Sequence, residues 1–172
     1  KEFDLVVCSG LYAEKWKINN NASDDYSNIL KLSKLLKTIE CKKFVLISTI
    51  DVYAIKENVN EDTKKFEFKE PYGANRYIFE QLCLEKFRNH CFIIRLPGLF
   101  GNSLKKNVLF DLLNNKNLNL INKASIYQYY NLDYILNDIN KVIKNKLKIV
   151  NLISEPINNK LLLKEFFPKI HY

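Results

Sequence analysis

The sequence predicts a three-layer α/β fold, in which a mainly parallel sheet carries helices on both faces. Three short apolar runs, at 4–8, 43–48 and 92–96, are expected to be buried strands because each ends in polar or turn-forming residues. Two segments between these runs, at about 25–39 and 71–87, carry apolar residues at helical spacing. Alternating buried strands and amphipathic helices are typical of a parallel sheet with right-handed crossovers.

The elements of the first half follow from the turn-forming and capping residues around these runs. Polar, Asn-rich stretches indicate loops, and a Ser or Asp ahead of an apolar helical pattern can cap a helix. We therefore expect a strand at 4–8 that ends in Ser9-Gly10, a loop at 11–22, a helix at 25–39 capped by Ser23 or Asp24, a strand at 43–48 and a loop at 54–70.

The second half continues this pattern with shorter elements. Pro71 can begin a helix because its missing N–H would be unpaired in the first turn anyway, and Pro97-Gly98 end the third strand. Next we expect a helix at 104–115, an extended piece at 118–128, a helix at 132–146 with Asn131 as its N-cap, a strand at 150–153 and a helix at 158–167.

Composition narrows the classes of protein and partner. The 27 basic and 19 acidic residues give a formal charge of +8, but the lysines are scattered, so we expect no nucleic-acid partner. The apolar runs are too short to span a bilayer and no signal-peptide pattern is visible, so we expect no membrane association. Four cysteines without metal-ligand spacing and only two histidines favour a reduced, cytoplasmic protein without a metal site.

The most informative residues lie where the second strand ends and the next helix begins. Ser48 and Thr49 end the apolar run, and a hydroxyl at a strand end could hold a substrate oxygen. Tyr72 and Arg76 are spaced i, i+4, so they share one helix face. A cation beside a phenol favours the phenolate and makes the tyrosine a better base. The pattern predicts an acid–base site.

These residues resemble the motifs of the extended short-chain dehydrogenase/reductases, the NAD-dependent epimerase/dehydratase family. Residues 48–53 resemble the family's Ser-Thr-x-x-Val-Tyr run, and 72–80 resemble Tyr-Gly-x-Ser-Lys-x-x-x-Glu. Residues 94–101 resemble its Arg-x-x-x-x-Tyr-Gly segment, which lies near the nicotinamide. The resemblance runs from about Asp4 to Phe167. It implies a Rossmann-type fold, NAD or NADP as cofactor, and a small-molecule sugar substrate, with nucleotide sugars as the expected class.

The resemblance also assigns roles to particular residues. Tyr72 would be the acid–base, and Thr49 or Ser48 would bind the substrate oxygen. Arg76 stands where the family has a lysine that lowers the pKa of the tyrosine and contacts the nicotinamide ribose. The other implied residues are Ser9, Gly10, Pro97 and Gly98, with Arg76, for the cofactor, and Asp51 and Asn28, with Thr49, for the substrate.

Two departures from the family bear on the reaction. Arginine is a planar fork and not a compact ammonium, so Arg76 is not a conservative replacement for lysine. The family's 4,6-dehydratases have an Asp-Glu pair after the threonine, where this chain has Ile50 and Asp51, so reduction or epimerisation is favoured. Arg76 also motivates an alternative, a catalytically inactive NAD(P)-binding sensor or scaffold, or a protein-interaction module, of the same fold.

The sequence has no Gly-x-Gly-x-x-Gly turn, which lets a backbone approach a pyrophosphate at a helix N-terminus. We therefore interpret residues 1–172 as a single α/β domain, truncated at its N-terminus and equivalent to the C-terminal two-thirds of a Rossmann-type domain. A small substrate-binding lobe is expected within 117–172. We expect a protein of these residues alone to bind NAD(P) weakly or not at all and to be inactive as a dehydrogenase. We also expect it to aggregate or to form a homodimer through the exposed edge of the strand at 4–8.

Overall fold

The structure is a computed structural model that describes residues 2–55, 57–63, 68–102, 104 and 107–170. Parts of the predicted loop at 54–70 and of the predicted helix at 104–115 lie outside these residues. The chain falls into two compact units. Unit 1 comprises Lys1–Arg95 and Ile139–Asn151, and unit 2 comprises Leu96–Asp138 and Leu152–Tyr172.

A four-stranded parallel sheet forms the centre of unit 1 and confirms the predicted fold class. Its strands, in spatial order, are β2 (Val6–Cys8), β4 (Phe44–Thr49), β5 (Cys91–Leu96) and β9 (Ile149–Asn151). β2 pairs in parallel with β4, and β5 pairs in parallel with β9. The predicted strand at 150–153 therefore extends the main sheet. Two shorter strands, β1 (Glu2–Phe3) and β3 (Glu40–Cys41), pair in parallel beside it.

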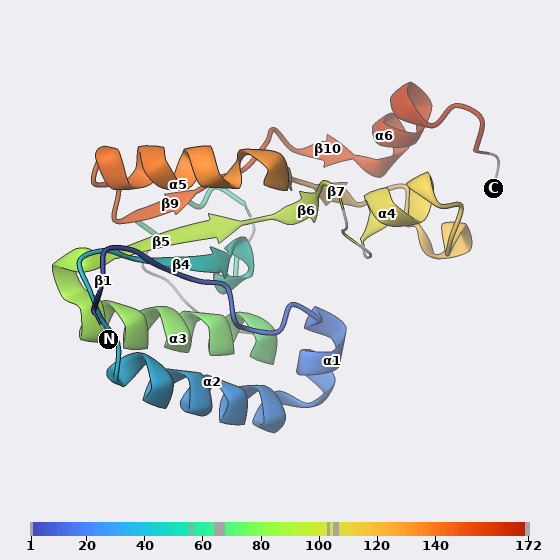
Figure 1. The fold of residues 1–172 in the computed structure, drawn as a ribbon. Coiled ribbons are helices and arrows are strands. Elements are labelled where there is room, and N and C mark those ends of the chain that lie inside the picture. The colour runs from blue at the N-terminus through green and yellow to red at the C-terminus, as the bar shows by residue number, and fades with distance from the viewer. Residues whose placement is uncertain (1, 56, 64–67, 103, 105–106, 171–172) are drawn as a thin grey trace. The chain divides into compact units, whose positions relative to one another are not determined.

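Helices cover both faces of this sheet (Figure 1). α2 (Ala22–Lys37) and α3 (Pro71–Phe87) lie on one face, and α5 (Ile135–Lys144), whose residues from 139 belong to this unit, lies on the other. All six residues of β5 are buried, as expected for a strand between two layers of helices. Phe44 and Phe87 stack with ring centroids 3.9 Å apart and fix the C-terminal end of α3 to the sheet.

α3 begins and ends where the sequence predicted. Pro71 occupies the first turn after an extended Glu70, and the helix ends at Phe87, before the short 3₁₀ helix η2 (Arg88–His90). Its buried face includes two charged side chains, Arg76 and Glu80, one turn apart. Buried charges require partners, so the groups that pack around this helix must supply counter-charges for both side chains.

Residues 11–22 are not the loop that the sequence predicted, because they contain α1 (Lys15–Asn20). Ile18 is only 4% exposed and packs this helix into the unit. Tertiary burial therefore overrides the weak helix propensity of the asparagines. The cap prediction was also wrong, because α2 already begins at Ala22 and Asn21 joins the two helices.

Unit 2 is built from short elements around its own small apolar core. β6 pairs in parallel with β8, and β7 pairs antiparallel with β10. Its elements are β6 (Gly98–Phe100), α4 (Val108–Leu113), η3 (Leu118–Leu120), β7 (Ile126–Tyr127), β8 (Tyr129–Asn131), η4 (Leu132–Tyr134), β10 (Ile157–Asn158) and α6 (Asn159–Phe166). The core contains Leu112, Ile121, Leu162 and Leu163. A substrate-binding role for 117–172 stays a prediction.

Candidate active site

The threonine that ends β4 and the tyrosine that begins α3 meet in unit 1. Thr49 accepts a hydrogen bond from the backbone N–H of Asp51 at 3.1 Å and so caps the 3₁₀ helix η1 (Ile50–Val52). Tyr72 is 8% exposed, and the side chains of Thr49 and Arg76 lie near enough to its phenol to lower the pKa of that group. Two residues that the sequence singled out, Thr49 and Arg76, thus lie beside the phenol of a third, Tyr72.

Gly73 makes this meeting possible. A Cβ at residue 73 would overlap the backbone carbonyl oxygen of Asp51, which cannot move aside as a side chain could. Glycine is less favourable than alanine within a helix by about 1 kcal/mol. Its position here is explained by the close approach of α3 to η1, which brings Tyr72 against Thr49.

Arg76 is held in a buried ion pair with Asp25 of α2. Its Nη1 and Nη2 donate to the two carboxylate oxygens at 2.9 and 3.0 Å, in a bidentate arrangement, and the side chains are 4% and 2% exposed. Nη2 also donates to the carbonyl oxygen of Tyr12 at 2.6 Å, and Asn75 donates to Asp25 at 2.8 Å. The sequence analysis did not identify Asp25.

A sequence signal for Asp25 does exist. It lies on the same helix face as Ile29 and Leu36, both of which are buried. A carboxylate on an apolar stripe needs a cation or several donors, since burial of an unpaired charge is very unfavourable. The stripe could have indicated a partner for Arg76.

Burial is the largest influence on Tyr72 and raises the pKa of its phenol above the ordinary value of 10.0. The charge of Arg76 lowers the pKa, the charge of Asp51 raises it, and the hydrogen bonds from Arg76 and Thr49 lower it. The guanidinium carbon lies 4.7 Å from the centre of the Tyr72 ring. Arg76 therefore acts on the pKa in the expected direction, but burial outweighs it and the phenol is protonated at neutral pH.

Ser48, the neighbouring candidate, belongs to a second buried network. Its hydroxyl donates to Glu80 Oε1 at 2.6 Å, and Arg95 donates to both carboxylate oxygens of Glu80 at 3.0 and 2.6 Å. Arg95 Nη1 also donates to the hydroxyl of Tyr53 at 2.7 Å, and that hydroxyl lies 3.1 Å from the side-chain amide of Asn151. Ser48 thus links β4 to α3 and β5, whereas the Thr49 hydroxyl caps η1 and lies near the Tyr72 phenol.

A pocket of about 300 Å³ begins beside Asp51. Lys15 of α1 bridges two carboxylates there, 2.9 Å from Asp51 and 2.9 Å from Glu70. Burial lowers the pKa of Lys15, but its hydrogen bonds to the two carboxylates and their charges raise it overall, so the ammonium stays charged. Lys15 was not predicted as a site residue because it lies in a segment that was predicted to be a loop. The pocket is lined by Lys15, Asp51, Tyr53, Ala54, Phe68, Lys69 and Glu70.

The predicted cofactor residues Ser9 and Gly10 are exposed in the loop that follows β2. The same loop reaches Tyr12, whose carbonyl oxygen binds Arg76. This loop lies at the carboxyl end of a parallel strand, where ligands of open α/β sheets bind.

The other predicted residues lie apart from this cluster or belong to unit 2. Asn28 is half-buried on α2, one turn beyond Asp25. Pro97 follows β5, and Gly98 begins β6 of unit 2, where it pairs with Tyr129. Their roles stay predictions.

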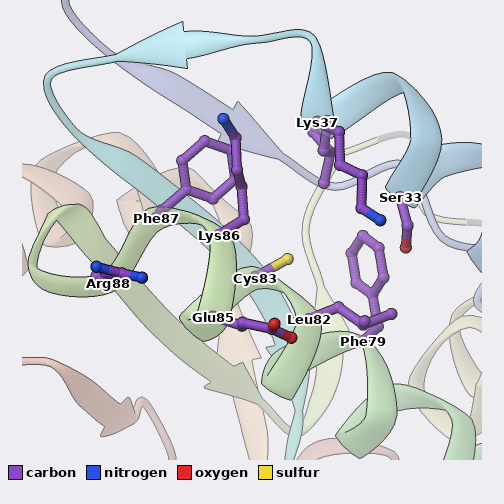
Figure 2. Close-up of a pocket in the computed structure, with 10 residues that line it drawn as sticks. Ser33, Lys37, Phe79, Leu82, Cys83, Glu85, Lys86, Phe87 and Arg88 are labelled. Atoms are coloured by element: carbon purple, nitrogen blue, oxygen red, sulfur yellow. The ribbon is translucent and has the colours of Figure 1, made fainter.

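A second hollow, of about 370 Å³, lies between the C-terminal halves of α2 and α3 (Figure 2). Phe79, Leu82 and Cys83 supply its apolar side, and Lys37 and Lys86 lie at its edge. Burial raises the pKa of the Cys83 thiol well above 9.0, so this sulfur is not a thiolate nucleophile. The hollow contains no residue of the candidate site.

The described ranges contain neither a candidate metal site nor a candidate membrane-spanning helix. No group of three or more His, Cys, Asp or Glu side chains there is placed to hold a metal ion. None of the helices described has the length and apolar character needed to cross a membrane.

Solved structures with similar folds include a dehydratase, an epimerase and an NADPH-bound protein. TunA, an NAD-dependent NDP-hexosamine 5,6-dehydratase of tunicamycin biosynthesis, is 16% identical with a TM-score of 0.78, over 93% of this chain and 58% of its own. UDP-N-acetylglucosamine 4-epimerase from Methanobrevibacter ruminantium M1, in complex with UDP-N-acetylmuramic acid, is 16% identical with a TM-score of 0.75, over 94% and 58%. RMD from Pseudomonas aeruginosa, complexed with NADPH, is 14% identical with a TM-score of 0.75, over 94% and 63%.

The chain spans somewhat more than half the length of these neighbours, and at such low identity the likeness shows the fold. A search of curated protein sequences gave no significant match. The sequence model of the NAD dependent epimerase/dehydratase family, in contrast, matches residues 2–128. Because this match covers well over half of the chain, the protein belongs to the NAD-dependent epimerase/dehydratase family.

Proposed function

We propose that the full-length protein is an NAD(P)-dependent oxidoreductase or epimerase that acts on a sugar, with nucleotide sugars as the substrate class. The observation that carries this proposal is the proximity of Tyr72 to the Arg76 guanidinium and to Thr49, the residue that ends β4. Family membership supports it, as do the substrates and cofactors of the structural neighbours.

The described residues suit the proton-transfer side of such a reaction. Bound NAD(P) would supply or accept a hydride. Thr49 would hold the substrate oxygen, and Tyr72, which is protonated at neutral pH, would donate its proton to that oxygen. Arg76 would then lie beside the phenolate that remains, where its charge is stabilising.

The sequence offers candidate residues for the nicotinamide end of a dinucleotide but lacks the expected motif for its pyrophosphate. Tyr72 and Arg76 suit the nicotinamide end, and the exposed backbone of Ser9 and Gly10 leaves room for a cofactor to approach. The sequence contains no Gly-rich turn for the pyrophosphate. NAD(P) binding is therefore proposed for the full-length protein. The scattered charge supports the further proposal that the protein has no nucleic-acid partner. The free cysteines support the proposal of a cytoplasmic protein. Homodimer formation stays a prediction.

The second candidate is a catalytically inactive NAD(P)-binding sensor or scaffold. One observation favours it. The guanidinium of Arg76, which replaces the family lysine, already donates hydrogen bonds to Asp25 and to the Tyr12 carbonyl oxygen. Such a protein would bind the cofactor without turning it over.

Two measurements on the full-length protein separate the candidates. Calorimetry with NAD and NADP measures cofactor binding, and the absorbance of reduced nicotinamide measures hydride transfer with a panel of nucleotide sugars; sugar products identify epimerisation. We expect cofactor binding together with turnover of at least one nucleotide sugar. Binding without turnover on any sugar would support the sensor, and absence of both would overturn the two proposals together.

A further inference from the structure

Asp25 is a buried carboxylate that the motif-based site does not include. It projects from α2 toward α3 and accepts three hydrogen bonds, one from Asn75 and two from Arg76. Both acceptor oxygens are used by the guanidinium, which fixes the plane of that group as well as its position.

The position of the guanidinium matters because Tyr72 lies against it. The guanidinium carbon of Arg76 is 4.7 Å from the Tyr72 ring centre. A third donor contact, from Nη2 to the Tyr12 carbonyl oxygen, adds the loop after β2 to the same arrangement. Asp25 therefore determines where the positive charge beside the phenol lies and how much of it is balanced.

We propose that Asp25 is a positioning residue for Tyr72, which holds Arg76 in one orientation against the tyrosine ring and offsets its positive charge. This inference rests on the proposed function, in which Tyr72 is the acid–base. It assigns to Asp25 the control of that tyrosine's proton, and it makes Asp25 and Arg76 one functional unit.

The charges around Tyr72 allow the direction of the effect to be derived. Arg76 of α3 lowers the pKa of Tyr72, and Asp51 of η1 raises it. Asp51 is itself paired with Lys15 of α1, which also binds Glu70. Removal of the Asp25 charge leaves Arg76 unopposed, so the phenolate becomes more favourable and the pKa of Tyr72 falls.

The test is a pH titration of the whole chain labelled with ¹³Cζ-tyrosine, with the Tyr72 resonance assigned by its loss in Tyr72→Phe. We expect the pKa of Tyr72 to be lower in Asp25→Asn than in the wild type and to return toward the wild-type value in Asp25→Glu. Glu80→Gln is the matched control, because Glu80 is an equally buried carboxylate of a bidentate arginine pair. An unchanged or raised pKa in Asp25→Asn, or an equal fall in Glu80→Gln, would overturn the proposal.

A second measurement on the wild-type protein covers the case in which Asp25→Asn does not fold. The chain has three arginines, and Arg88 is exposed whereas Arg76 and Arg95 are buried in ion pairs. In ¹⁵N-arginine spectra we expect slow rotation of the Arg76 guanidinium and fast rotation for Arg88. Fast rotation at Arg76 would contradict the fixed orientation. Neither measurement requires turnover, so a failure of this inference can be distinguished from a failure of the proposed function.

Discussion

Two buried arginine–carboxylate pairs, each with one member on α3, provide the most useful comparison in this molecule. α3 contributes Arg76 to one pair and Glu80, one turn later, to the other. Each carboxylate accepts three hydrogen bonds, two of them from its arginine. Each guanidinium also lies over a tyrosine ring, at 4.7 Å for Tyr72 and 4.9 Å for Tyr53. The combination of a buried carboxylate, an arginine and a tyrosine ring therefore occurs twice.

The two pairs differ in what the tyrosine hydroxyl contacts. The Tyr53 hydroxyl accepts from Arg95 and lies beside the amide of Asn151, so it links β5, β9 and the loop after β4 within the core of unit 1. The Tyr72 phenol lies near Thr49 at a strand end and has the guanidinium beside its ring. We infer that the first arrangement is a structural link and that the second, which leaves a phenol at a strand end, is the chemical site.

The largest effect should come from breaking the structural pair. Glu80→Gln leaves Arg95 without its buried counter-charge, and we expect the free energy of unfolding to fall by about 3–5 kcal/mol. Urea denaturation measures this change. Glu85→Gln, at an exposed position on the same helix, is the control and should change stability by less than about 0.5 kcal/mol. Equal effects of the two substitutions would show that the Glu80–Arg95 pair is not stabilising.

The next effect separates the two hydroxyl residues at the end of β4. Thr49→Val removes the hydroxyl that faces Tyr72, and we expect turnover of the full-length protein to fall by roughly 10²-fold. Ser48→Ala removes a donor to buried Glu80, and we expect a stability loss of about 1–3 kcal/mol. Steady-state kinetics and denaturation on both variants give the ranking. A larger loss of turnover in Ser48→Ala than in Thr49→Val would reverse our assignment.

A smaller effect tests the close approach that brings Tyr72 to Thr49. Gly73→Ala places a Cβ against the Asp51 carbonyl oxygen, so α3 must shift, and we expect a stability loss of about 1–3 kcal/mol. Gly10→Ala is the matched control for thermal denaturation, because its Cβ would meet only Leu32 side-chain atoms, the nearest at 3.5 Å, an ordinary contact. If both variants melted like the wild type, the steric account of Gly73 would be wrong.

The sequence predicted the framework of unit 1 well because its signals are local. Apolar runs with sharp polar ends gave the strands β2, β4 and β5, and Pro71 marked the start of α3. Thr49 and Tyr72, which the motif resemblance named together, lie close to each other in the structure. Their roles as site residues stay predictions.

What the sequence did not reveal depends on contacts between distant segments. α1 forms because Ile18 is buried, which composition alone does not indicate. Asp25 pairs with Arg76 across 51 residues, and Ser48 bonds to Glu80 across 32. Spacing along one helix identified Tyr72 and Arg76 as neighbours, but it carried no information about the carboxylate opposite them.

The most direct test of the account is the effect of Tyr72→Phe on hydride transfer in the full-length protein, measured by single-turnover absorbance of the nicotinamide. The substitution conserves ring shape and the contact with Arg76 but removes the proton donor. Tyr26→Phe, at an exposed tyrosine of α2, is the control. The account predicts a loss of about 10²–10⁴-fold for Tyr72→Phe and wild-type rates for Tyr26→Phe. Wild-type rates for Tyr72→Phe would contradict it.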